Sequence, residues 1–125
     1  MLPSAVRLLV ARAKANTALA AIQGTRVGSK LNATLPATRV QRVGGSVPDT
    51  WEDNPVVQIE AWAADEETAD LLARTWLDAL PAMRHRAADG QVHSYSVQSV
   101  LFAPDDQNLS SNSRFIITAR LLVTP

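Results

Sequence analysis

The sequence predicts an α+β fold, in which a mixed, mainly antiparallel β-sheet of about five strands packs two helices on one face. Residues 56–62 and 114–123 place apolar side chains at every second position, which is the period of a strand. Residues 69–80 place them at three- and four-residue spacing, which is the period of a helix. In chain order the expected elements are a helix, three strands, a helix and two strands, and this order indicates an α+β sheet.

Composition indicates one globular domain spanning residues 1–125. The chain has 125 residues, of which 46% are hydrophobic and 19% are charged, as expected for a folded domain. It has no cysteine, which excludes disulfides, thiol catalysis and cysteine zinc sites. No apolar run approaches the ~20 residues of a membrane span. Arg7 interrupts the N-terminal apolar stretch, so we expect neither membrane insertion nor a signal peptide.

The first quarter of the chain is predicted to be helical. Residues 4–17 have apolar side chains at helical spacing, and Ser4 is a plausible N-cap. Residues 18–22 add a second short apolar segment, which Gly24 closes.

Two strands and a loop are expected next. Residues 25–29 predict a weak first strand and residues 37–43 a stronger second one, which Gly44-Gly45 ends. Residues 46–54 have the composition of a turn-rich loop that carries one aromatic residue, Trp51.

The strand at 56–62 and the helix after it are the most clearly specified elements. In the strand, Val57, Ile59 and Ala61 face one way, and Gln58, Glu60 and Trp62 face the other. Asp65 is the expected N-cap of the helix, and the acidic side chains of its first turns suit the positive end of the helix dipole. The residues of its apolar stripe are Ala69, Leu72, Ala73, Trp76, Leu77 and Leu80.

Two long strands are expected to complete the sheet. They lie near residues 92–102 and 114–123, and a polar loop at 104–113 joins them. This loop is too long for a tight hairpin.

Charge is divided along the chain. Residues 1–48 contain seven Arg or Lys and no acid, whereas the rest contains twelve acids and five bases. A fold with this division either neutralises itself internally or offers opposite charges to its neighbours.

No pattern in the sequence is typical of a catalytic, cofactor-binding or metal site. His85 and His93 lie on different elements without evident partners, which favours an ordinary helix-end or strand histidine in each case. A calcium loop starting at Asp106 would need Gly at position 111 and Glu at position 117, but the chain has Ser111 and Ile117. The loop is therefore either solvated or ordered against a partner. The glycine-containing segments lack the Lys-Ser/Thr of a phosphate loop.

The basic first third offers no stacking platform, because the chain has no Phe, Trp or Tyr before Trp51. Direct nucleic-acid binding is therefore the weaker interpretation. Trp51 itself either packs on its own sheet or anchors a contact with a partner.

Eight short segments together resemble a known family. They are Leu2-Pro3-x-Ala5, Gly24-Thr25-Arg26-Val27, Leu35-Pro36, Arg42-Val43-Gly44-Gly45, Trp51-x-Asp53-x-Pro55, Gln58-Ile59-x-x-Trp62, Ala69-x-x-Leu72-Ala73 and Arg114-Phe115. In this order and spacing, over nearly the whole chain, they resemble the tail terminator (tail completion) proteins of long-tailed bacteriophages, especially those of actinobacterial phages.

The resemblance implies a single tail-terminator-like domain that is a structural virion protein and not an enzyme. Such a protein forms a ring, expected to be a hexamer, on the head-proximal end of the tail tube. It stops tube polymerisation and presents a docking surface to the head-completion (stopper) protein. Its partners would be other copies of itself, the major tail tube protein and the stopper, with DNA only passing through the lumen. It would be located in the virion, after assembly in the host cytoplasm, with no membrane and no cofactor.

The charge division fits such a ring, because a basic surface on one copy could face an acidic surface on the next. Exposed ion pairs contribute only ~0–1 kcal/mol each, so apolar area must supply most of the affinity. The candidate contact residues are Arg39, Arg42, Trp51, Glu52, Asp53, Asp105, Asp106, Asn108 and Arg114. The alternatives are another phage neck, head-closure or tail-tube subunit, or an unrelated ligand-binding α+β domain.

Overall fold

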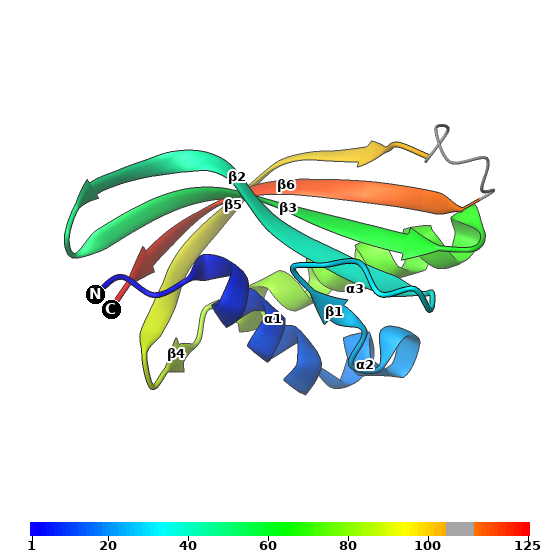
Figure 1. Ribbon diagram of the computed structural model, residues 1–125, viewed down its shortest axis with the longest axis horizontal. Coiled ribbons are helices and arrows are strands. Elements are labelled where there is room, and N and C mark those ends of the chain that lie inside the picture. The colour runs from blue at the N-terminus through cyan, green and yellow to red at the C-terminus, as the bar shows by residue number, and fades with distance from the viewer. Residues whose placement is uncertain (105–111) are drawn as a thin grey trace.

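The computed structural model describes residues 1–104 and 112–125 and confirms the α+β class (Figure 1). The candidate contact residues Asp105, Asp106 and Asn108 lie outside this range. The elements in chain order are α1 (Ala5–Ala15), α2 (Thr17–Gln23), β1 (Val27–Gly28), β2 (Ala37–Asp49), β3 (Glu52–Ala63), α3 (Glu66–Met83), β4 (Arg86–Ala87), β5 (Gly90–Phe102) and β6 (Ser113–Thr124).

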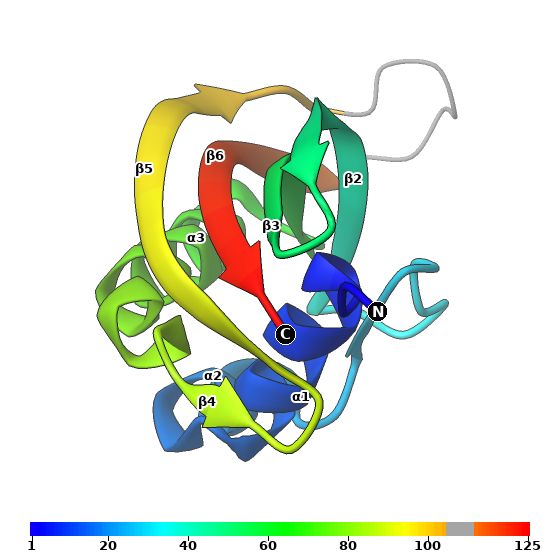
Figure 2. The same ribbon diagram turned by 90° about the vertical axis from the view of Figure 1, so that its left-hand side faces the viewer.

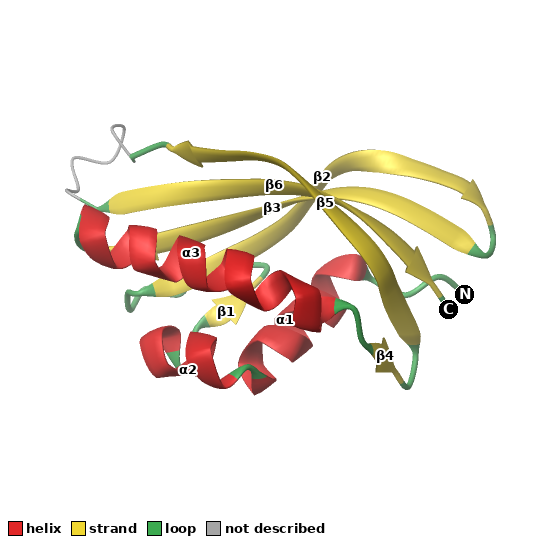
Figure 3. Cartoon of the chain, turned by 180° about the vertical axis from the view of Figure 1, so that it is seen from behind, coloured by secondary structure: helices red, strands yellow, loops and turns green. Residues whose placement is uncertain are grey.

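The strands form one six-stranded sheet in the order β1-β2-β3-β6-β5-β4. The pair β1–β2 is parallel and the other four pairs are antiparallel, as predicted for a mixed, mainly antiparallel sheet. The helices lie together on one face of the sheet, and no helix of the described residues covers the other face (Figure 3). The described chain has three helices and six strands, against the two helices and about five strands expected.

The extra helix arises because the predicted helix at 4–17 breaks at Asn16. This residue has an extended backbone (φ −79°, ψ 120°), and its N–H donates to the carbonyl of Ala13. Its side chain accepts a hydrogen bond from the N–H of Leu19 at 3.0 Å. Asn16 therefore ends α1 and caps α2. Ser4 caps α1 as predicted, accepting from the N–H of Arg7 at 3.2 Å.

The core lies between α3 and the middle of the sheet. Val57, Ile59 and Ala61, which the sequence predicts to share one face of β3, are fully buried. The α3 stripe packs on β3 and β6, and Asp65 is the N-cap of this helix, as predicted. Hydrogen bonds from Thr68, first from its backbone N–H and then from its hydroxyl, hold the pKa of Asp65 below its usual range.

The predictions that Gly44-Gly45 ends the second strand and that residues 46–54 form a loop are wrong. β2 continues to Asp49, and β3 begins at Glu52, so the two strands form one long hairpin. A β-bulge lies directly before the glycine pair, where Arg42 pairs with Val57 and Gly44 with Val56, so that Val43 is the extra residue. Gly45 has φ 102°, a backbone conformation that residues other than glycine rarely adopt. Gly44 and Gly45 then pair with Val56 and Pro55 of β3, so the strand continues through them.

Replacing Gly45 by alanine is expected to lower the free energy of unfolding by at least about 2 kcal/mol. A Cβ there would lie 2.2 Å from the backbone oxygen of Asn54, in addition to the strained φ. Gly44→Ala is the matched control, because a Cβ at Gly44 meets no atom within 4 Å. We expect it to change stability by no more than ~0.5 kcal/mol. Urea unfolding of both variants measures the difference, and equal effects would contradict the bulge explanation.

Candidate subunit interface

Two predicted contact residues, Arg39 and Arg114, lie on the helix-free face of the sheet and hold one buried carboxylate. Glu60 is 1% exposed, on the strand between them. Arg39 donates to Glu60 through Nη2 at 2.8 Å and Nε at 3.1 Å, so the guanidinium binds in a forked geometry. Arg114 Nη1 lies 3.6 Å from the other carboxylate oxygen.

Two further donors and one stacked ring complete this cluster. Gln41 Nε2 and Trp62 Nε1 donate to Glu60 at 3.0 and 3.1 Å. The Arg114 guanidinium lies 4.9 Å from the ring centre of Trp62, in cation–π contact. The cluster contains two cations and one anion, and its carboxylate is fully hydrogen-bonded.

Two other candidates, Arg42 and Asp53, pair across the β2–β3 hairpin. Arg42 Nη1 lies 2.7 Å from Asp53 Oδ2, and Asp53 is 4% exposed. Arg42 Nε also donates to the carbonyl of Gly44 at 3.0 Å, so this arginine fixes the bulge. Within the described residues, the second oxygen of Asp53 is buried without a hydrogen-bond partner.

These contacts show that part of the charge division is neutralised within the chain. Three bases of the first third form ion pairs with acids of the remainder. The pairs are Arg7 with Asp89, Arg39 with Glu60 and Arg42 with Asp53. Arg39 and Arg42 remain predicted contact residues, but each would enter an interface already paired with an acid.

The tip of the β2–β3 hairpin carries the candidates Trp51 and Glu52. Trp51 is 73% exposed, so it does not pack back on its own sheet. Its backbone N–H donates to the Asp49 carboxylate at 2.7 Å, which holds the turn. Glu52 accepts a hydrogen bond from the side chain of Asn54 at 3.3 Å. Of the two roles considered for Trp51, contact with a partner remains a prediction.

Both edges of the sheet are largely without a strand partner in the part of the chain that the structure describes. β1 pairs only with Thr38 and Arg39, which leaves residues 41–49 of β2 open on their outer side. β4 pairs only with the first two residues of β5, which leaves residues 92–102 open. Figure 2 shows β5 and β2 at opposite edges of the curved sheet.

Exposed apolar side chains gather on these two edges. Seven of the ten large apolar residues that are exposed in the described chain lie there, namely Val43, Val47 and Trp51 on the hairpin and Val97, Val100, Leu101 and Phe102 on β5. Long apolar edge strands promote association and are usually covered or charged. Sequence reasoning missed β5 as a contact strand, although residues 94–102 contain no charged side chain, which was an available signal.

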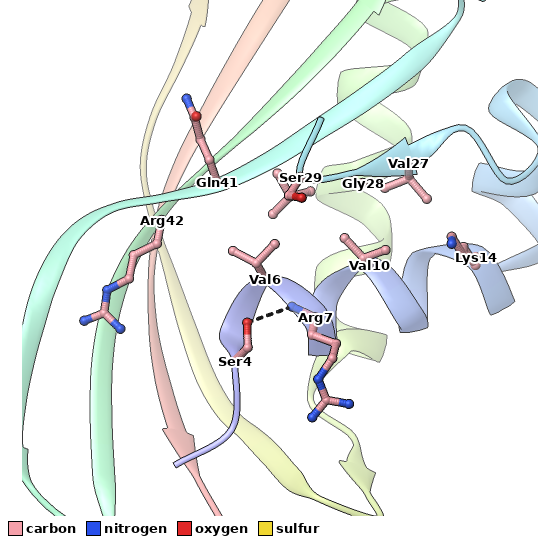
Figure 4. A pocket seen from close by; sticks show the side chains of 11 residues that line it. Ser4, Val6, Arg7, Val10, Lys14, Val27, Gly28, Ser29, Gln41 and Arg42 are labelled. Carbon is pink, nitrogen blue, oxygen red and sulfur yellow. Dashed lines mark hydrogen bonds between the residues drawn. The ribbon is translucent and has the colours of Figure 1, made fainter. Parts of the chain in front are cut away.

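A groove lies beside the free part of β2, between α1, β1 and β2. Its volume is about 570 Å³. Its apolar lining is Val6, Val10, Val27 and Val40, and its basic lining is Arg7, Lys14 and Arg42. Figure 4 shows Val6 and Val10 pointing from α1 toward β1 and β2, while Gln41 points away on the other face. The sequence did not indicate this groove, because three separate segments form it.

Nothing in the described residues assembles a catalytic or metal site. No group of three or more His, Cys, Asp or Glu side chains lies close enough to hold a metal ion within residues 1–104 and 112–125. His93 Nε2 lies 2.8 Å from the hydroxyl of Thr124, and both His85 and His93 are exposed. None of the described helices has the length and apolarity to cross a membrane.

The comparisons with known proteins rest on structure. No family model matches the sequence, and no curated protein matches it. A solved structure, described as "Virion of native gene transfer agent (GTA) particle", contains a chain with a similar fold. The fold of this chain is similar to that of one chain of the particle. The two superpose with a TM-score of 0.64 at 20% identity, over 98% of this chain and 100% of the other.

Proposed function

We propose that this chain is a structural virion protein, and specifically a tail terminator. Copies of it would form a ring, a hexamer, on the head-proximal end of a phage tail tube. The ring would stop tube polymerisation and present a surface to the head-completion protein. It would act by binding alone, with no cofactor, and DNA would pass through its lumen.

The observation that carries the ring is that, within residues 1–104 and 112–125, one sheet has two unlike edges that are largely without a strand partner. The edge of β2 carries the hairpin with Trp51, and the edge of β5 carries Val97, Val100 and Phe102. A contact between unlike surfaces repeats from copy to copy, and it closes into a ring when the rotation per copy divides a full turn. Such a contact would cover both apolar edges at once.

The virion role is supported by the similarity to a chain of the gene transfer agent particle, which extends over 98% of this chain and 100% of the other. The spacing of the motifs in the sequence supports the narrower role as terminator. We retain Arg39, Arg42 and Trp51 as proposed contact residues. Because Arg39 and Arg42 each hold a buried acid, reversing their charge would also destabilise the fold. Substitutions on the β5 edge therefore give a cleaner test.

Val100→Lys is expected to abolish ring formation without unfolding the chain. The substitution places a charge on the uncovered apolar edge, which opposes strand association. Leu71→Lys on α3 is the matched control, since Leu71 is 50% exposed and Val100 is 47% exposed. Native mass spectrometry measures the oligomer in solution. Negative-stain images of purified tail tubes incubated with each protein show whether the tube ends are capped.

Two results would contradict the proposal that this chain is a tail terminator. Wild-type protein that stacks into long cylinders would be a tube subunit. Wild-type protein that stays monomeric, both alone and with purified tail tubes, would contradict any ring-forming phage role.

A further inference from the structure

We propose that the groove between α1 and β2 receives the β5 edge of a second copy of this chain. Val97, Val100 and Phe102 of that copy would lie against the apolar lining of the groove. This inference rests on the ring proposed above and specifies the contact that closes it.

Strand direction allows the sheet to continue from one copy into the next. β2 is antiparallel to β3, β3 to β6, and β6 to β5. When the order repeats in a second copy, β5 of the first meets β2 of the second in antiparallel orientation. The two open segments, residues 92–102 and 41–49, have similar lengths. Their unpaired N–H and C=O groups can therefore pair along most of both edges.

The three apolar β5 side chains lie on the correct face of the sheet for this contact. Val97, Val100 and Phe102 pair across β6 with Ala119, Ile117 and Phe115. Ile117 and Ala119 are buried in the core beneath the helices, so their β5 partners point to the helix side as well.

No helix of the described residues covers these side chains, because α3 packs on β3 and β6. Their exposed fractions are between 38% and 47%. The groove lies on the same helix side, next to the open part of β2. A continuous sheet would thus bring the uncovered side chains of one copy to the groove of the next.

The chemistry of the two surfaces also agrees. The groove presents the half-buried valines Val6 and Val10, with the buried Val27 and Val40 behind them. Residues 94–102 of β5 contain no charged side chain that would have to be desolvated on entering it. Arg7, Lys14 and Arg42 can keep their charged groups at the rim while their stems cover apolar surface. A symmetric β5–β5 contact would also be antiparallel, but it would leave the groove and the β2 edge uncovered.

A cysteine pair tests this contact directly, because the chain has no cysteine of its own. In the double variant Val10→Cys/Val100→Cys, one cysteine lies in the groove and the other on the β5 edge. We expect mild oxidation to give a ladder of covalent oligomers on a non-reducing gel, extending to the size of the ring. Disulfides require Cα atoms within about 7 Å. The scan therefore also includes Val6→Cys, one helical turn from Val10 in the groove, and Phe102→Cys, the next residue on the same face of β5.

Three controls decide the outcome. Either single variant should give no covalent product, and Val10→Cys/Ala21→Cys, with the second cysteine exposed on α2, should give no ladder. Covalent dimers of Val100→Cys alone would overturn the groove contact in favour of a symmetric β5 dimer. Rings seen by native mass spectrometry that no scanned pair cross-links would overturn it while leaving the proposed function intact. Absence of rings, alone and on tail tubes, would overturn both.

Discussion

Replacing Trp76 by alanine is expected to lower the free energy of unfolding by about 3–5 kcal/mol. Trp76 is fully buried in α3, and its Nε1 donates to the Thr38 hydroxyl at 3.0 Å. That hydroxyl donates in turn to the buried side chain of Gln23, so the network joins α3, β2 and α2. Alanine would leave a cavity and remove the donor from the network. Urea or thermal unfolding measures the loss.

Trp51→Ala is the matched control, because it removes the same side chain from a position that is 73% exposed. We expect it to change stability by no more than ~0.5 kcal/mol. Trp76→Phe keeps most of the buried ring and removes the N–H donor, and its cost should be smaller than that of alanine. A Trp76→Ala protein as stable as Trp51→Ala would contradict the assignment of Trp76 to the core.

Removing the carboxylate of Glu60 is expected to cost about 2–4 kcal/mol. The carboxylate is 1% exposed and accepts from Arg39, Gln41 and Trp62. Without it, Arg39 and Arg114 become two neighbouring cations that lack their shared anion. The cost falls below that of breaking a fully buried pair, because both guanidinium side chains are partly exposed and can bind water.

A double-mutant cycle isolates this interaction. The double variant Arg39→Ala/Glu60→Ala should be less destabilised than the sum of the two single variants. Each single variant already loses the Arg39–Glu60 interaction, so the sum counts that loss twice. Glu67→Ala, which removes an exposed carboxylate near the start of α3, is the control and should cost no more than ~0.5 kcal/mol. Strict additivity of Arg39→Ala and Glu60→Ala would show that the forked pair contributes nothing to stability.

The sequence predicted the elements whose pattern is set within a single segment. The stripe of α3, its Asp65 cap and the shared face of Val57, Ile59 and Ala61 in β3 all follow from helix and strand periods or capping preference, and each is present in the structure. Periodicity failed at Gly44-Gly45. A bulge keeps a strand paired through residues that usually interrupt it, and its presence depends on the partner strand rather than on the local sequence.

The candidate contact residues also show the difference between what one segment predicts and what depends on a partner segment. The sequence singled out Arg39 and Arg42 from the charge division, but it did not indicate that the hairpin register sets Arg39 beside Glu60, twenty-one positions later. It also gave no sign of the groove, whose valines come from α1, β1 and β2.

What the sequence determined by itself was the fold class, the apolar stripe of α3, the division of β3 residues between two faces, and the absence of any motif typical of catalysis. These properties depend on the repeat distance of one backbone segment and on the chemistry of its side chains. Only the tertiary structure decided which charges are already paired and which sheet edges stay open. Both depend on which distant segments meet in space, and side-chain periodicity within one segment does not indicate which segments those are.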